Sequence, residues 1–277
     1  MQHKITDILN VLWYVLVFLI IQYVVMLGGC SVWLMSKGYS AGNALRSALM
    51  GETINDGMTL AIVLAVTSII TIAVFVLWHW SPLSQRFLRS RPWTALLWVA
   101  LLTCGTVIPS VWMLEQLHAD MPEYMQQLFL QIMREPWGYL ALGILAPVAE
   151  EMVFRGAVLR TLLNIFSREW HWMAILLSAL LFGAVHGNVP QFLHAALTGL
   201  LLGWLYYRTD SIVPGIVLHW VNNTIAYVGY NLYPQSADQP LIDLFGGSQQ
   251  RVWAALGFSL CIFLPSLFQV NRRLKKG

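Results

Sequence analysis

The sequence predicts an all-α protein, a polytopic bundle of transmembrane helices. Of its 277 residues, 58% are hydrophobic and only 10% are charged, and the mean hydropathy is +0.64. About a quarter of the residues of a soluble globular protein are charged, so this chain is too poor in charge to cover a surface that faces water. Its apolar residues form continuous runs and do not alternate with polar ones, which favours spanning helices over a β-barrel.

Eight segments are candidates for spanning helices, since a span needs about 20 mainly apolar residues. They are Leu9–Leu34, Gly57–Trp78, Pro92–Leu114, Trp137–Phe166, His171–Gly187, Pro190–Tyr207, Ser211–Tyr233 and Val252–Val270. The fourth is long enough to tilt or to leave the membrane at one end. The fifth and sixth are short, and the residues between them form either an external turn or a break within the membrane. We expect one membrane domain over residues 1–277.

The basic residues predict an orientation, because cytoplasmic loops of membrane proteins are enriched in Lys and Arg. With the N-terminus inside, the outer segments hold only Lys37, Arg46, Arg134 and Arg251. The inner segments hold the larger set, namely Lys4, Arg86, Arg89, Arg91, Arg160, Arg168, Arg208, Arg272, Arg273, Lys275 and Lys276. We therefore expect an even number of spans, with both termini in the cytoplasm.

Two other classes of site find little support. The basic residues do not cluster on one soluble segment, so we expect no nucleic-acid partner. The three cysteines, Cys30, Cys104 and Cys261, lie far apart inside apolar runs. Their spacing fits neither a disulfide framework nor a zinc ribbon, and we expect three buried thiols that fill space in the bundle.

Ionisable residues inside the predicted spans are the best indication of function, because charge is costly in hydrocarbon and usually faces a protein interior or a water-filled cavity. They are Glu150, Glu151 and Arg155 in the fourth span, His186 at the end of the fifth, His194 in the sixth, and His219 with Asn222 and Asn223 in the seventh. At 1.5 Å per residue from the inner ends, Glu150, His186, Asn223 and His219 lie at depths of about 24, 22, 18 and 12 Å. These overlapping depths on three helices indicate one shared site.

The spacing of these residues leaves two interpretations open. Glu151 and Arg155 are four apart and can pair on one helix face, whereas Glu150 points about 100° away. The pair is either a salt bridge that joins helices or a support for a catalytic Glu150. His219 and Asn223, also four apart, either bond to other helices or present two donors to one point. His194 is a packing residue, a pore-lining residue or a further member of the site.

These motifs resemble the CPBP family of intramembrane proteases, also called CAAX-processing or Abi proteases. The family signature is Glu-Glu-x-x-x-Arg, Phe-x-x-x-His and His-x-x-x-Asn on successive membrane helices. All three occur here in order, as Glu150 to Arg155, Phe182 to His186 and His219 to Asn223. The resemblance covers roughly residues 145–224, and we expect a protease-like core over about 137–233. His194 has no counterpart in the signature.

The resemblance implies that Glu150 and His186 activate a water, and that His219 and Asn223 stabilise the oxyanion, with Glu151 and Arg155 in support. The implied substrate is a membrane-bound or lipid-anchored peptide, the implied surroundings are membrane lipid, and the implied location is the bacterial cytoplasmic membrane. We expect no cofactor. In a zinc-dependent alternative, Glu150, His186 and His219 would be the ligands.

Two non-hydrolytic functions remain as alternatives. One is a catalytically inactive scaffold or immunity protein, against which the complete set of motifs argues. The other is a proton-coupled transporter whose buried Glu and His residues form a relay. Transporters often contain duplicated halves with matching broken helices, and the sequence shows no duplication. A covalent mechanism is disfavoured, because Ser178 and Cys104 have no obvious partner base.

Overall fold

The computed structural model describes residues 2–234 and 239–274, and in this part of the chain it contains helices and no strands. Lys275 and Lys276, which the predicted orientation assigns to the inner side, lie outside the described residues. The first half of the chain forms α1 (Gln2–Ser36), α2 (Ala41–Leu49), α3 (Gly57–Leu77), α4 (Gln85–Arg89), α5 (Trp93–Gln116) and α6 (Glu123–Arg134). The predicted all-α helical membrane bundle is confirmed.

The second half begins with a nearly continuous helix and then turns back on itself. The central helix consists of α7 (Pro136–Gly138), η1 (Tyr139–Leu145), α8 (Ala146–Glu151), η2 (Met152–Leu159) and α9 (Arg160–Ile165). After the 3-10 turn η3 (Arg168–Trp170) come α10 (His171–Ala184), α11 (Val189–Thr209), α12 (Val213–Leu232), α13 (Leu241–Leu244) and α14 (Gln249–Arg273). Elements η1 and η2 are π-helical, a geometry found mostly as short insertions at functional sites.

Four of the described helices are long and apolar enough to cross a membrane: α1 from Lys4, α3, α5 and α14. The other predicted spans also form helices, but they carry more polar and small residues. Helix α10 has only 14 residues, fewer than the roughly 20 that cross a bilayer. The count of eight spans therefore stays a prediction, as does the side on which the termini lie.

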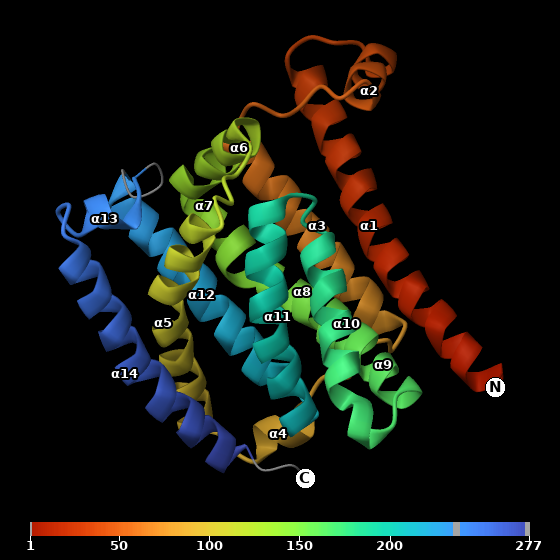
Figure 1. Ribbon diagram of the computed structural model, residues 1–277. Coiled ribbons are helices and arrows are strands. Elements are labelled where there is room, and N and C mark those ends of the chain that lie inside the picture. Colours follow the sequence, from red (N-terminus) through yellow and green to blue (C-terminus); the bar gives the residue numbers. More distant parts are fainter. Residues whose placement is uncertain (1, 235–238, 275–277) are drawn as a thin grey trace.

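The central helix lies inside the bundle, and the four helices that are long and apolar enough to cross a membrane lie outside it. Helices α1 and α3 pack on one side of α8 and η2, and α10 and α12 pack on the other (Figure 1). Helices α5 and α14 form a pair that contacts the rest of the bundle mainly through α12 (Figure 1). The core around η2 is filled by large side chains such as Phe154, Phe182, Leu202 and Leu218.

Charged residues are unevenly distributed between the two ends of the bundle. Helix α4 and the C-terminal ends of α9, α11 and α14 lie at the end where α1 begins (Figure 1). This end carries Arg86, Arg89, Arg208, Arg272 and Arg273. The segment between α10 and α11 forms a tight turn at the opposite end, with Gly187 at a positive φ of 72°. The arrangement is compatible with the asymmetry on which the predicted orientation rests.

Candidate active site

The two neighbouring glutamates come from the middle of the central helix. Pro147 begins the short α-helical piece α8 between the two π-helical segments. A proline has no N–H to donate, which interrupts the regular hydrogen-bond ladder at this point. Glu150 and Glu151 end α8, and Arg155 follows one turn later in η2, whose eight residues are all buried.

Glu151 and Arg155 form the predicted ion pair, and it is sealed from solvent. Nη1 of Arg155 donates to Oε1 of Glu151 at 2.7 Å, and both side chains are 0% exposed. Nη2 of Arg155 also donates to the carbonyl of Gly199 at 3.5 Å, and the guanidinium lies 4.4 Å from the ring centroid of Phe182. Breaking such a buried pair is strongly destabilising, because it leaves one charge uncompensated.

Two glycines on neighbouring helices make room for this pair. A Cβ on Gly215 of α12 would collide with Oε2 of Glu151. A Cβ on Gly199 of α11 would lie 3.3 Å from Nη2 of Arg155 and 3.0 Å from the backbone of Ala179. The close approach of α11 and α12 to the central helix therefore depends on residues without side chains.

Glu150 differs from Glu151 in exposure and in partner. Its side chain is 20% exposed, and its Oε2 lies 3.7 Å from Nε2 of His219. The other ring nitrogen of His219, Nδ1, lies 3.4 Å from Oε1 of Glu151. That Nδ1 is buried and makes no hydrogen bond of regular geometry, so the contact with Glu151 is electrostatic. One imidazole thus stands between the two carboxylates, one sealed and one accessible.

His186 lies just beyond the end of α10, where the chain turns into α11. Its Nδ1 lies 2.9 Å from the carbonyl of Phe182. A carbonyl can only accept, so Nδ1 carries the proton and Nε2 of the neutral ring is left with a lone pair. Asn188 fixes the turn, since its side-chain amide donates to the carbonyl of His186 at 3.0 Å and its Oδ1 caps α11.

Phe182 connects the two histidines. Its ring meets that of His186 edge-on, with centroids 5.2 Å apart, and that of His219 with centroids 5.8 Å apart. Together with the guanidinium contact, the phenyl ring therefore forms one wall of the site. Phe182 is not among the site residues that the sequence predicts. Its place in the signature, four residues before His186, is the sequence feature that could have identified it.

Asn223 follows His219 by one turn of α12. Its amide donates to the carbonyl of Leu142 at 2.9 Å, and its Oδ1 accepts from Asn222 at 3.1 Å. This is one of several bonds that tie α12 to residues 133–142. The others include Trp220 to Tyr139 at 2.9 Å, Tyr227 to the carbonyl of Glu135 at 2.9 Å, and Asn231 to the carbonyl of Met133 at 3.0 Å. These bonds fix the register of α12 against the glutamates.

The structure links most, but not all, of the predicted site residues directly. Ion-pair contacts join Arg155, Glu151, His219 and Glu150 in a chain, but among the described residues no such contact joins Glu150 to His186. The charges of His186 and His219 act on His194 of α11, but no hydrogen bond or ion pair of the described residues joins His194 to the site, so its role stays open.

One alternative for this site is a zinc centre. Within residues 2–234 and 239–274, no group of three or more His, Cys, Asp or Glu side chains is arranged to hold a metal ion. The zinc ligand set of Glu150, His186 and His219 does not form such a group, and the metal-independent mechanism stays a prediction.

Cys30, Cys104 and Cys261 are free thiols, of which only Cys30 is buried. The expectation of three buried thiols is wrong for the other two, which lie in the lipid-facing helices α5 and α14.

Fold and site together define a helical membrane protein with a Glu–Arg–His cluster buried among its central helices. Residues 133–225 match the family model "Type II CAAX prenyl endopeptidase Rce1-like". Over 86 residues the chain is 29% identical to the "Putative membrane peptidase YdiL" of Bacillus subtilis (strain 168), a match that covers 31% of this chain and 34% of that protein. No solved structure matches the chain significantly. The resemblance to the CPBP intramembrane proteases is thereby confirmed over the segment that carries all six predicted site residues.

The match covers only part of this chain and part of its relative, so it supports conclusions about the matched segment alone. The chain covers about a third of the length of the curated relative that it matches. The matched residues include α8, η2, α10, α11 and most of α12, but not α1 to α5 or α14. The comparisons therefore concern the central helices, and the matched residues include none of the four helices that are long and apolar enough to cross a membrane.

Proposed function

We propose that this protein is an intramembrane endopeptidase that hydrolyses a peptide bond of a membrane-bound or lipid-anchored substrate in a bacterial cytoplasmic membrane. The name of the Bacillus relative describes a membrane peptidase, and the matching family model describes prenyl endopeptidases. The protease-like core that we propose, residues 137–233, overlaps the matched residues 133–225. The six site residues lie within both ranges.

The observation that carries this proposal is the difference between two adjacent glutamates. Glu151 is fully buried and paired with Arg155, which suits a structural role. Glu150 has no such partner, is partly accessible and faces His219 at 3.7 Å. A general base must reach the proton that it abstracts, and of the two carboxylates only Glu150 is accessible to a water.

The geometry supports activation of a water beside Glu150. At 3.7 Å, Oε2 of Glu150 and Nε2 of His219 are too far apart for a direct hydrogen bond. A single water oxygen at about 2.8 Å from each atom would contact both of them. In this mechanism Glu150 takes the proton as the water attacks the substrate carbonyl. His186, whose Nε2 has a lone pair, assists as the second proton acceptor and later protonates the leaving amine.

The negative charge that develops on the carbonyl oxygen requires donors aimed at it. We assign this role to Nε2 of His219 and to the side-chain amide of Asn223. One N–H of that amide is used by the carbonyl of Leu142, and an amide group has two. Glu151 lies on the far side of the His219 ring, 3.4 Å from Nδ1, and its charge favours the ring orientation that leaves Nε2 facing Glu150 and the substrate.

The proposal includes no metal and no other cofactor, because a carboxylate base and two donors are enough for attack by water. A zinc-dependent reaction would instead place Glu150, His186 and His219 on the ion. The two mechanisms differ in their response to chelation, which belongs in the first assay.

The test is cleavage of a pool of membrane-anchored peptides by the purified protein in proteoliposomes, with a chelator in a parallel reaction. We expect product from the wild type, with or without the chelator, none from Glu150→Gln, and far less from His186→Ala than from the wild type. Inhibition by the chelator would contradict the metal-independent mechanism. A proton-dependent flux without any product would indicate a transporter, and activity of the Glu150→Gln variant would refute the catalytic assignment.

A further inference from the structure

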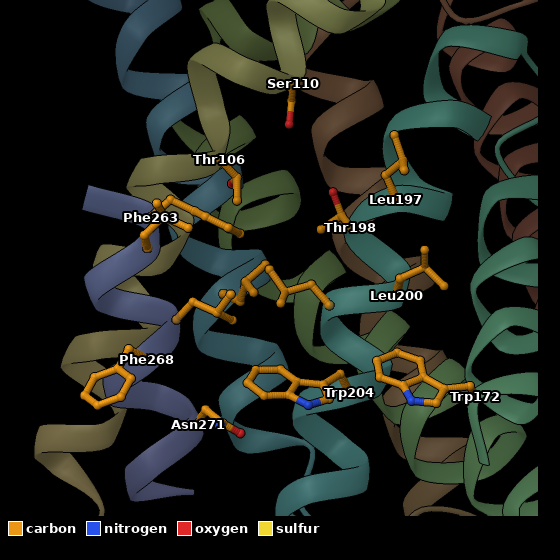
Figure 2. Close-up of a pocket in the computed structure, with 14 residues that line it drawn as sticks. Thr106, Ser110, Trp172, Leu197, Thr198, Leu200, Trp204, Phe263, Phe268 and Asn271 are labelled. Atoms are coloured by element: carbon orange, nitrogen blue, oxygen red, sulfur yellow. The ribbon is translucent and has the colours of Figure 1, made fainter. Parts of the chain in front are cut away.

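A large groove lies between α11 and the pair formed by α5 and α14. It has a volume of about 710 Å³, which lies within the range of about 300–1,000 Å³ typical of small-molecule sites. Its walls come from α5, α11 and α14, with contributions from Trp172 of α10 and Leu218 of α12 (Figure 2). None of the six predicted site residues lines it.

The polarity of the groove changes along its length. Its middle is lined by apolar side chains, namely Leu197, Leu200, Leu201, Leu218, Phe263, Leu264 and Leu267. The small hydroxyl residues Thr106, Ser110 and Thr198 lie toward one end, and Trp172, Trp204 and Asn271 lie toward the other (Figure 2). Tryptophan is enriched where a membrane protein meets the headgroups. The tryptophan end therefore has the character of a membrane interface.

The groove opens to the outside of the bundle. Leu197, Leu264 and Phe268 along its rim are 46%, 58% and 63% exposed. Leu197 belongs to α11, and Leu264 and Phe268 belong to α14. Both helices have large apolar side chains on their outer surfaces. In a protein whose solvent is lipid, such a groove is accessible to acyl chains from the side.

The tryptophan end of the groove lies beside Arg208, whose positive charge is not neutralised by any described carboxylate. Arg208 donates to the carbonyl of Leu274 at 2.9 Å, to Oδ1 of Asn271 at 2.7 Å and to the carbonyl of Asn271 at 2.8 Å. All three acceptors are neutral, and no described carboxylate, including the nearby Asp210, lies within ion-pair distance of the guanidinium. Arg272 and Arg273 in the last turn of α14 add to the charge at the same end.

The length of the groove fits one leaflet of a bilayer. From Leu197 to Arg208, helix α11 rises about 16 Å at 1.5 Å per residue. The hydrocarbon core of a bilayer is about 30 Å thick, so this distance is about half of it. A lipid whose headgroup lies at Arg208 would thus place its acyl chain along the leucines, with the chain end near Thr106.

We propose that this groove binds one acyl chain of an anionic phospholipid from the leaflet at the basic end, with the lipid phosphate beside Arg208. The apolar walls, the interfacial tryptophans, the unneutralised guanidinium and the half-bilayer length all point to the same ligand. The inference does not depend on the proposed peptidase activity, because the groove and the catalytic cluster share no side chain.

Native mass spectrometry of the detergent-purified protein tests this site, using phosphatidylglycerol and phosphatidylcholine with identical acyl chains as probes. We expect one retained lipid, with about a fivefold preference for phosphatidylglycerol, the ratio that follows from the membrane electrostatics of one arginine. Thr198→Phe, which fills the groove, should abolish retention of either lipid. Arg208→Gln should keep a lipid but lose the preference, and Arg208→Lys should restore it.

The matched control is Ile262→Phe, which adds a similar ring on α14 at a residue that is 42% exposed and does not line the groove. It should bind phosphatidylglycerol like the wild type, and thermal melting should show that all variants are folded. Equal retention of both lipids by the wild type would overturn the proposal. Unchanged retention by Thr198→Phe would do the same, as would a second copy of the chain occupying the groove in place of lipid.

Discussion

The central helices and the outer helices of this bundle differ in how readily hydropathy identifies them as membrane spans and in whether they carry the predicted site residues. Helices α1, α3, α5 and α14 are the four that are apolar and long enough to be recognised as membrane spans. They carry none of the six predicted site residues. The central helix, α12 and the end of α10 carry all six, and the glycines on which close packing depends lie on α11 and α12.

This difference has a physical origin. A helix that faces lipid must be apolar on its outer surface, as in α14, where Phe258, Leu264 and Phe268 are all more than half exposed. A helix that faces only protein can hold charge if the charge is paired, as in η2, where every residue is buried. The helices that are hardest to recognise as spans are therefore those that can contain a reactive site.

The comparison is tested most strongly by removing the buried charge of the central helix. Arg155→Met leaves Glu151 buried without a counter-charge, and we expect a loss of about 3–5 kcal/mol in the free energy of unfolding. Chemical denaturation in detergent micelles would measure it. Arg89→Met, at an exposed arginine of α4, is the control and should be within error of the wild type. Equal stability of both variants would show that the pair contributes nothing.

A second test asks whether the two ends of one helix differ in function. His186→Ala removes a proposed proton acceptor, and the rate of peptide cleavage should fall by about 100- to 10,000-fold without a change in melting temperature. His171→Ala, at the opposite end of α10, should cleave at the wild-type rate. The pH profile of cleavage should lose one ionisation only in the His186 variant. A wild-type rate in that variant would remove His186 from the mechanism.

A third test concerns two glycines on the same helix. Gly215→Ala places a methyl group against Oε2 of Glu151, and we expect about 1–3 kcal/mol of destabilisation with a parallel loss of cleavage. At Gly229, a Cβ has no neighbour within 4 Å, so Gly229→Ala should be neutral or slightly stabilising. Thermal melting and cleavage assays of the two variants side by side would decide. If Gly215→Ala is as stable as Gly229→Ala, the proposed close approach is wrong.

The smallest effect is expected on an outer helix, at the N-cap of α3. The carboxylate of Asp56 accepts from the hydroxyl of Thr59 and, at 2.8 Å, from its backbone N–H. These bonds hold the pKa of Asp56 below its usual value of 3.8, and the Thr59 hydroxyl makes the largest contribution. A lowered pKa means that the cap stabilises the helix above the usual value and loses its effect as pH falls through the lowered one.

Asp56→Ala should therefore cost about 1 kcal/mol at neutral pH and nothing under strongly acidic conditions. Hydrogen exchange of the first turn of α3 would measure this locally. Asp56→Asn keeps a neutral acceptor and should remain protected at both pH values. If the alanine variant exchanged like the wild type at neutral pH, the cap would have no energetic role.

The sequence predicted contacts within one helix better than contacts between helices. The i, i+4 spacing predicted the bond between Glu151 and Arg155, because two residues of one helix need no tertiary information. The pairing of His219 with Glu150 could not be derived in the same way, since it depends on the register of α12 against the central helix. That register is set by backbone acceptors such as the carbonyls of Leu142 and Met133, which carry no sequence signal.

The same reasoning explains the limits at the level of the fold. Hydropathy predicted a helical bundle correctly, but it gave no information on which helices lie inside. The π-helical geometry around Pro147 and the short α10 depend on packing against neighbours, whereas the continuous apolar runs of α3 and α14 do not. The groove beside α14 was not predicted either, because its residues come from five separate helices.

The central claim is that Glu150 performs the chemistry and that Glu151 maintains the structure, and one paired measurement tests it. The variants Glu150→Gln and Glu151→Gln differ by a single position, and cleavage of a membrane-anchored peptide and thermal melting would be measured for both. We predict that Glu150→Gln melts like the wild type and yields no product, whereas Glu151→Gln melts at a clearly lower temperature because Arg155 loses its counter-charge. Cleavage at the wild-type rate by Glu150→Gln, or wild-type melting and cleavage by Glu151→Gln, would contradict the account.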